Sequence, residues 1–364
     1  MKTLSEINLN KNPFSETTPS REQNFFWAGM KTVKDRIADC YQDAIDNNGK
    51  QLILNWGPYG GGKTFSSFYF LAEHSTDPNL TQIYVRSPKD GSKATREIFN
   101  TIIDELTFDR ISEQVRELLN TVENADFLKY LSGRAGVEFA KAIVLIGSDD
   151  NNITALMNRF LYSSVTATEL KTLGLAKQIK TDGDLAKFLT GLLSCFSYDG
   201  NEQSFKLCMW FDEMEDLIYY STKHYQALSQ FLRDLYDNIP NNLLIFLNFT
   251  LAEGEDTTIE LILGTALWSR IIKKIRFKDF DHSDALEYSF DLLNEGKIDK
   301  RSPNPMDKAH LKKLIDMLPL GSLTPREINK KMTAIIKFLR TKDLVLTDDQ
   351  VINDFITQQE QEES

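Results

Sequence analysis

The chain has 364 residues, with 42 lysines and arginines against 53 aspartates and glutamates, which gives a net charge of −11. This charge argues against non-specific nucleic-acid binding over the whole surface, although it leaves room for a local basic patch. Apolar residues make up 41% of the chain and charged residues 26%, which is typical of a folded globular protein rather than a disordered one. The length suits one large domain or two modest ones.

Cysteine and histidine usage excludes two further classes of site. Cys40, Cys195 and Cys208 show no paired spacing, and two of them lie in apolar runs, which indicates a reducing compartment. The four histidines show no metal-ligand spacing. Because no signal pattern and no apolar run of bilayer length is present, we expect a cytoplasmic protein with no membrane contact.

The first 24 residues are polar, and we expect them to form an extended N-terminal arm anchored only at Asn12-Pro13-Phe14. The aromatic run 25–29 (FFWAG) follows. We interpret it as packing of the arm onto the next domain, with covering of an adenine ring as the second interpretation. Apolar residues at helical spacing then predict a helix over 33–45.

The stretch 51–70, QLILNWGPYGGGKTFSSFYF, organises the rest of the chain. It contains G-x-x-x-x-G-K-[ST] between a predicted strand and a predicted helix, the context that a phosphate-binding P-loop requires. A chance match in a glycine-rich turn is the alternative, and this context argues against it. We expect Lys63 to reach the β- and γ-phosphates and the Thr64 hydroxyl to hold Mg²⁺. The predicted nucleotide-binding residues are Gly57, Pro58, Tyr59, Gly60, Gly61, Gly62, Lys63, Thr64 and Phe65.

A strand over 82–86 and a helix over 93–106 come next, followed by a long insertion, 107–200, that we predict to be mostly helical. The apolar run 205–211 (FKLCMWF) predicts a central strand of a parallel sheet. It ends in Asp212-Glu213, the Walker B arrangement. Asp212 would hold Mg²⁺ through water and Glu213 would polarise the attacking water. Two solvated acids at a strand end are the alternative.

Another buried strand is predicted over 243–247, after a helix over 224–236. Asn248 is our first choice for a residue that senses the γ-phosphate and Thr250 the second, with a simple strand-end cap as the alternative. Helices are then predicted over 283–294, 306–317 and 324–342. The last of them opens with Thr324-Pro325-Arg326-Glu327, an N-cap followed by proline and a capping-box glutamate.

The order of these motifs resembles that of AAA+ ATPases, and within them the Orc/Cdc6 branch and its bacterial relatives in mobile-element, secretion and defence loci. The resemblance implies a P-loop NTPase fold, an α/β class with a parallel sheet flanked by helices and a C-terminal all-helical lid. It divides the chain into an arm (1–24), an α/β domain (25–278, with the insertion 107–200), a lid (279–357) and an acidic, disordered tail (358–364).

The resemblance also implies roles for two arginines. Arg270, next to Ser269, would act as an arginine finger in the site of a neighbouring subunit. Arg326 on the lid would contact the γ-phosphate in its own subunit. The alternatives are that Arg270 belongs to a solvated or nucleic-acid-facing basic strip, and that Arg326 pairs with Glu327 or Asp316.

Three departures limit what the resemblance transfers. Gly29-Met30-Lys31 stands where the branch commonly has Gly-Arg-Glu, and the insertion is longer than the fold requires. After the lid, too few residues remain for the winged-helix DNA-binding domain of Orc/Cdc6 proteins. DNA binding is therefore not carried over.

Our leading hypothesis is an ATPase switch that uses ATP and Mg²⁺ to assemble a homo-oligomer and to recruit or remodel a protein or DNA partner, in a defence or mobile-element system. The alternative is an ATP-binding signalling or scaffold NTPase with little turnover, acting through its insertion. A small-molecule phosphotransferase is the third hypothesis, and the Asp-Glu pair, Asn248 and the separate lid argue against it.

Overall fold

A computed structural model of the chain describes residues 2–47, 49–198, 206–251, 256–318, 323–342 and 349–363. The chain forms two compact units, and each is described by itself. The arm–lid unit comprises Met1–Arg36, Gly57–Glu73 and Arg276–Ser364, and the sheet unit comprises Ile37–Trp56 and His74–Ile275. None of the described helices is both long and apolar enough to cross a membrane.

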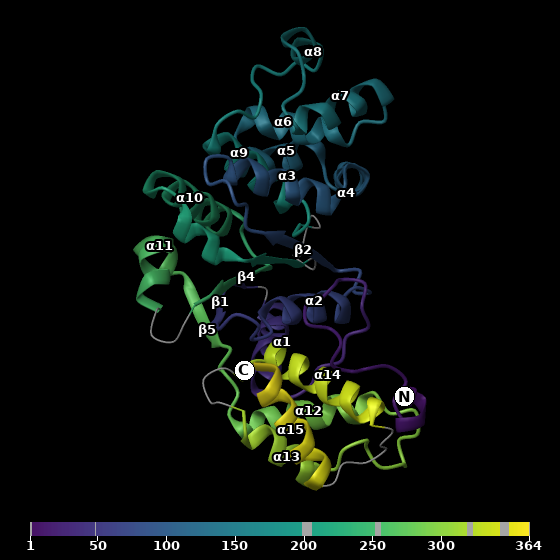
Figure 1. Ribbon diagram of the computed structural model, residues 1–364. Coiled ribbons are helices and arrows are strands. Elements are labelled where there is room, and N and C mark those ends of the chain that lie inside the picture. Colours follow the sequence, from purple (N-terminus) through teal and green to yellow (C-terminus); the bar gives the residue numbers. More distant parts are fainter. Residues whose placement is uncertain are drawn as a thin grey trace. The chain divides into compact units, whose positions relative to one another are not determined.

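The sheet has five parallel strands in the order β2-β3-β4-β1-β5 (Figure 1). These are β1 (Lys50–Gly57), β2 (Leu80–Arg86), β3 (Lys206–Asp212), β4 (Leu243–Thr250) and β5 (Ile271–Arg276). The central strands are buried on both faces, as their continuous apolar runs predict. The register places Arg86, the last residue of β2, opposite Asp212, the last residue of β3. The predicted fold class is confirmed.

The other described elements of the sheet unit are helices. They are α3 (Ala94–Leu106), α4 (Phe108–Thr121), α5 (Asn124–Ala135), α6 (Val137–Ile146), α7 (Asn151–Leu161), α8 (Ala167–Thr172), α9 (Asp182–Ser194), η2 (Met214–Tyr219), α10 (Thr222–Asn238) and α11 (Asp256–Trp268). Figure 1 shows α3 to α9 gathered on one side of the sheet. The insertion therefore consists of packed helices, and its core is continuous with that of the sheet.

Phe188 of α9 lies at the centre of the insertion. Its ring centroid is 6.1 Å from that of Phe99, 5.7 Å from that of Phe139 and 6.0 Å from that of Phe160. All four side chains are fully buried. Because these rings come from four different helices, they tie the helices of the insertion to α3 in one packed core.

The arm–lid unit contains η1 (Ser5–Ile7), α2 (Lys63–Glu73), α12 (His282–Glu295), α13 (Lys308–Asp316), α14 (Pro325–Thr341) and α15 (Asp349–Glu363). Helix α1 (Lys31–Asn47) is divided between the two units. Two expectations for this unit are corrected. The arm is anchored not only by Phe14 but also by Ile7 and Leu9, each fully buried among lid side chains. Single apolar residues in a polar segment give no periodic signal, so the sequence did not show these anchors.

The second correction concerns the acidic tail, which we expected to be disordered. Helix α15 continues to Glu363, and residue 364 lies outside the described residues. The helix is held by Val351, Ile352 and Phe355, whose ring lies 5.4 Å from that of Phe338. Glutamate and glutamine are good helix formers, which agrees with a helix at these positions.

Helix α9 begins with a capping box that gives a testable pH dependence. The Asp184 carboxylate accepts hydrogen bonds from the Thr181 backbone and from Lys177 Nζ, at 3.1 and 2.8 Å. Burial alone would raise the Asp184 pKa, but these hydrogen bonds outweigh it and lower the pKa to about 2. Because the folded pKa is depressed, the stabilisation is present above the ordinary pKa near 4 and is lost as the pH falls through about 2.

We expect Asp184→Asn to lower the free energy of unfolding by about 1 kcal/mol at pH 7, the usual worth of a helix cap. Urea unfolding from pH 7 down to pH 2 would show the variant and the parent chain converging at the acid end. Asp182→Asn, in the same helical turn, is the matched control and should cost less. A difference that persists unchanged at pH 2 would show that the carboxylate charge is not the cause.

Candidate active site

The P-loop lies in the arm–lid unit and joins β1 to α2. Gly60 and Gly62 have φ angles of 77° and 97°, a left-handed conformation that favours glycine. A Cβ atom at Gly62 would lie 3.0 Å from Met30 Cε, so a side chain there would crowd the loop. These glycines leave the loop backbone open to an anionic ligand, the shape that a polyphosphate needs.

Lys63 is the first residue of α2 and is 6% exposed. Its ammonium group donates hydrogen bonds to the backbone oxygens of Gly57, at 2.9 Å, and Pro58, at 2.8 Å. The cation is therefore held inside the loop rather than in solvent. Thr64 follows it as the second residue of the helix. Lysine, hydroxyl and open glycine loop together fit a magnesium–nucleotide polyphosphate.

The predicted nucleotide-binding residue Phe65 belongs to an aromatic cluster on α2. Its ring centroid lies 5.7 Å from those of both Phe25 and Trp27. Trp27 is nearly buried, and its indole N–H donates to the Gly29 carbonyl at 2.9 Å. The aromatic run after the arm thus packs against the helix that follows the P-loop, which is the interpretation that we favoured for it.

Asp212 ends β3 in the sheet unit and is 2% exposed. The Tyr84 hydroxyl donates to its Oδ2 atom at 2.7 Å, and the Asn248 amide donates to its Oδ1 atom at 3.0 Å. Asn248 in turn accepts a hydrogen bond of 3.0 Å from the Asn55 amide. We call these four residues the polar row. Burial, reinforced by the Asp212 carboxylate, raises the pKa of Tyr84, so the phenol stays a donor.

Glu213 follows Asp212 in a left-handed conformation, with φ of 57°. Its Oε2 atom lies 3.2 Å from Arg86 Nε in a half-exposed ion pair. Burial raises the pKa of Glu213, and the Arg86 guanidinium opposes that rise. A carboxylate with a raised pKa next to a buried aspartate is suited to accept a proton from water.

Asn248 and Thr250, the two candidates for γ-phosphate sensing, both lie within β4. Asn248 is fully buried, and its side chain belongs to the polar row. The Thr250 backbone N–H donates to a Glu215 carboxylate oxygen at 3.0 Å. Asn248 is thus a neighbour of Asp212 rather than a strand-end cap, and its sensing role remains a prediction.

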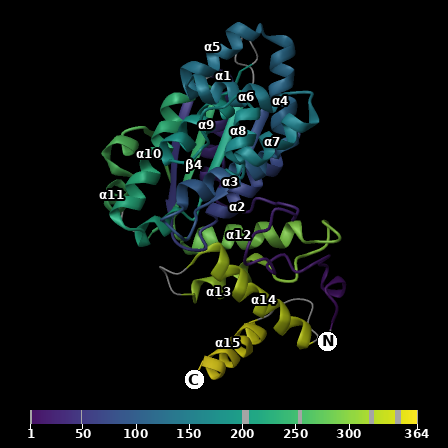
Figure 2. The same cartoon turned by 90° about the horizontal axis from the view of Figure 1, so that it is seen from above.

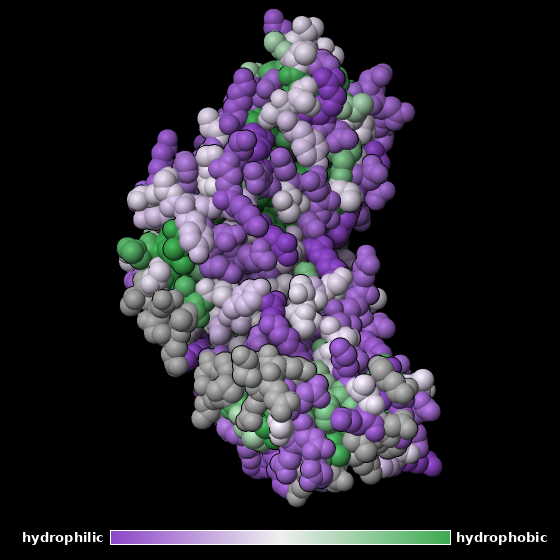
Figure 3. All heavy atoms as spheres, viewed as in Figure 1, coloured by the Kyte–Doolittle hydropathy of each residue, from purple (hydrophilic) through white to green (hydrophobic). Residues whose placement is uncertain are grey.

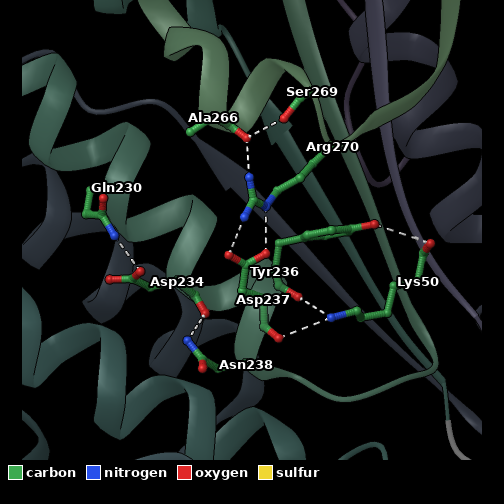
Figure 4. Close-up of polar contacts among 9 residues, drawn as sticks. All are labelled: Lys50, Gln230, Asp234, Tyr236, Asp237, Asn238, Ala266, Ser269 and Arg270. Carbon is green, nitrogen blue, oxygen red and sulfur yellow. Dashed lines mark hydrogen bonds and ion pairs between the residues drawn. The ribbon is translucent and has the colours of Figure 1, made fainter.

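Figure 4 shows the Arg270 side chain turned toward Asp237 on α10. Its Nε and Nη2 atoms donate to the two Asp237 carboxylate oxygens, each at 2.6 Å, and Nη1 donates to the Ala266 carbonyl. Hydrogen bonding to Asp237 raises the pKa of Arg270. Lys50, the first residue of β1, donates to the Tyr236 and Asp237 carbonyls beside this pair.

This cluster lies at the edge of the sheet where the strands begin, whereas Asp212 lies where they end. In a parallel sheet these are opposite edges. Arg270 is therefore not placed to act on the Asp212 of its own chain, and its role as an arginine finger remains a prediction.

Arg326 is the second residue of α14 in the arm–lid unit. Its guanidinium carbon lies 4.1 Å above the centre of the Tyr59 ring, and its Nε atom donates to the Thr17 carbonyl at 3.0 Å. The alternative pairings are not found: Glu327 pairs with Lys330, and Asp316 pairs with Lys312. The lid arginine thus contacts the P-loop itself.

No protein-family model and no curated protein matches the sequence. Among solved structures, Aeropyrum pernix ORC2 in ADPNP–ADP complexes matches with a TM-score of 0.52 and 11% identity, over 93% of this chain and 70% of that one. A. pernix ORC1 in complex with DNA matches with a TM-score of 0.51 and 11% identity, over 98% of this chain and 71% of that one. Drosophila ORC bound to DNA matches with a TM-score of 0.51 and 9% identity, over 96% of this chain and 65% of that one. The chain has an Orc/Cdc6-type AAA+ fold.

The AAA+ fold confirms the family resemblance at the level of architecture. Within the arm–lid unit, the structure brings Arg326 to the P-loop. Within the sheet unit, it brings Asn248 to Asp212 and places Arg270 apart from both. Among the described residues, no group of three or more histidine, cysteine, aspartate or glutamate side chains could hold a metal ion.

Four residues that contact predicted site residues were not predicted from the sequence. Tyr84 contacts Asp212 and Arg86 contacts Glu213. Asn55 contacts Asn248, and the Tyr59 ring contacts the Arg326 guanidinium. One signal was present: Asn55 is a polar residue inside the apolar run of β1, where a buried amide needs partners. The other three gave no local signal.

Proposed function

We propose that the protein is an ATPase switch that binds ATP with Mg²⁺ and hydrolyses it. The observation that carries the proposal is the P-loop, in which Lys63 is held within an open glycine loop at the start of α2. Thr64 and Asp212 would hold the metal, Glu213 would polarise the attacking water, and Asn248 and Arg326 would respond to the γ-phosphate. Phosphoryl transfer needs positioning and charge stabilisation, which these groups supply.

We further propose that ATP orders a homo-oligomer in which Arg270 enters the site of a neighbouring subunit. Two apolar residues of this region are exposed: Leu261 in α11, 73% exposed, and Ile272, two residues after Arg270, 54% exposed. Figure 3 shows hydrophobic residues gathered at the surface over α11. Apolar surface beside a cation is suited to a protein contact. The assembled, cytoplasmic protein would then recruit or remodel a protein or DNA partner, in a defence or mobile-element system.

The experiment is the mass of the purified protein in solution, by light scattering, without nucleotide, with ADP and with a non-hydrolysable ATP analogue. Each condition is run with and without double-stranded DNA. We expect an ATP-dependent oligomer that Arg270→Ala abolishes. Lys274→Ala is the matched control, because Lys274 is a nearby cation that lies on the Trp268 ring.

A mass that does not change with nucleotide would overturn the assembly proposal. Equal effects of Arg270→Ala and Lys274→Ala would favour the basic-strip interpretation over the finger. An increase in mass only in the presence of DNA would point to DNA as the partner.

One observation favours the second candidate, an ATP-binding scaffold with little turnover. The Glu213 carboxylate is engaged by Arg86, and an ion pair weakens a carboxylate as a proton acceptor. On this hypothesis the insertion, whose helices pack around Phe188, would carry the partner surface. Turnover that stays at the background rate while ATP binding is normal would support it.

A further inference from the structure

Helix α14 carries a row of polar side chains at positions 326, 329, 333 and 340. Spacings of three, four and seven residues place all four on one face of a helix. Each donates a hydrogen bond to a backbone carbonyl of the N-terminal arm. The pairs are Arg326 with Thr17 at 3.0 Å, Asn329 with Glu16 at 2.8 Å, Thr333 with Phe14 at 3.0 Å and Arg340 with Lys2 at 2.8 Å.

The arm therefore runs along α14 in the opposite direction to the helix. Figures 1 and 2 both show the N-terminal segment beside α14. Ile7, Leu9 and Phe14 are fully buried within the same unit, so the arm is docked by apolar packing as well as by its carbonyls. Such a segment is part of the lid and not a loose end.

The arm meets the P-loop at Arg326. The Arg326 Nε atom donates to the Thr17 carbonyl, and the Arg326 guanidinium lies over the Tyr59 ring. A Cβ atom at Gly60 would lie 2.9 Å from Arg326 Cβ, so the loop and the helix approach as closely as glycine permits. Within the described part of the chain, the two terminal nitrogens of Arg326 make no hydrogen bond.

We propose that the arm and Tyr59 position Arg326 so that its two terminal nitrogens point to the terminal phosphate of ATP. The planar fork of arginine matches two phosphate oxygens, and a side chain that is already held loses less freedom on binding. The arm thereby sets the preference for ATP over ADP. This inference rests on the proposed function, because it assumes that the P-loop binds a nucleotide.

The test is equilibrium titration of the full chain with ADP and with a non-hydrolysable ATP analogue, reported as the ratio of the two Kd values. Arg326→Ala should reduce the preference for the ATP analogue about tenfold, the worth of a charge-assisted contact. Tyr59→Ala should reduce it about threefold, as expected for a cation on an exposed ring. Tyr59→Phe, which keeps the ring, should retain most of the parent chain's preference for the ATP analogue.

A double-mutant cycle separates positioning from independent binding. If Tyr59 acts through Arg326, the double variant has the same ratio as Arg326→Ala alone. If the two effects multiply, Tyr59 contacts the nucleotide independently and the positioning proposal is overturned. An unchanged ratio in Tyr59→Ala, with a reduced ratio in Arg326→Ala, also overturns it.

The arm itself is tested by Thr333→Val, because deleting residues 2–17 would also remove three core side chains. This isosteric change removes the hydroxyl that bonds Asn12 and Phe14, at a position outside the site. We expect the ratio to fall about twofold in the parent chain and not to fall further in Arg326→Ala. Thr341→Val is the matched control, since among the described residues that hydroxyl donates only to the Lys337 carbonyl of its own helix.

An unchanged ratio in Thr333→Val would exclude the arm from positioning. Failure of the proposed function looks different: the parent chain would then bind neither nucleotide, and no ratio would exist. Binding of both nucleotides with altered ratios in the variants supports the inference.

Discussion

Lys63→Ala should weaken nucleotide binding at least a hundredfold and reduce ATP turnover to background. The ammonium group is the only P-loop side chain that we expect to neutralise the β- and γ-phosphates, and alanine leaves that charge unmet. The measurements are ATP hydrolysis by phosphate release and binding of a fluorescent ATP analogue.

The substitution also removes the Lys63 donor from the buried Gly57 carbonyl, whereas the part-buried Pro58 carbonyl still accepts from the Gly61 backbone N–H at 3.2 Å. A lost partner of this kind costs about 1–3 kcal/mol of stability, so folding must be checked by circular dichroism and urea unfolding. Lys223→Ala removes an exposed lysine from α10 and serves as the control for the change in net charge. Undiminished hydrolysis in a folded Lys63→Ala protein would disprove the P-loop assignment.

Glu213→Gln should retain ATP binding and lower the turnover rate at least a hundredfold. The amide keeps the size of the side chain but cannot take a proton from the attacking water. ATP would then remain bound, and the assembled state should accumulate in light scattering. Loss of binding together with turnover would contradict the water-polarising role.

The pH dependence of the parent chain tests the same residue. Burial raises the Glu213 pKa, and hydrolysis needs the deprotonated carboxylate, so activity should fall on the acid side as the pH drops through that raised pKa. Arg86→Ala removes the cation that opposes the rise, so the acid limb of the profile should move to higher pH. An acid limb that is identical in Arg86→Ala and the parent chain would mean that another group controls it.

The sequence predicted what depends on neighbours in the chain. The P-loop is read from eight consecutive residues, and Asp212-Glu213 from the end of one apolar run, because each motif is made within a single strand-and-turn unit. Four of the five strands, and the helices around them, follow from hydrophobic period and length. The parallel sheet and helical lid could therefore be stated before the structure was known.

The sequence did not predict contacts between distant segments. Arg326 and the Thr17 carbonyl are separated by 309 positions, and Tyr84 and Asp212 by 128. Such pairs depend on strand order and on how the arm docks, which no local pattern encodes. A backbone carbonyl that accepts a side-chain hydrogen bond also cannot be identified from the sequence, because every residue has a backbone carbonyl.

The polar row of Asn55, Asn248, Asp212 and Tyr84 has a consequence for how the sheet is specified. Its members come from four adjacent strands, each hydrogen-bonded to the next. If any one strand shifted by a single residue, its member of the row would point to the other face of the sheet. The remaining polar groups would then be buried without that hydrogen-bond partner. The row therefore fixes the alignment of the strand ends, and its members should tolerate joint replacement better than single replacement. An attempt to redesign this interior would have to change all four positions at once.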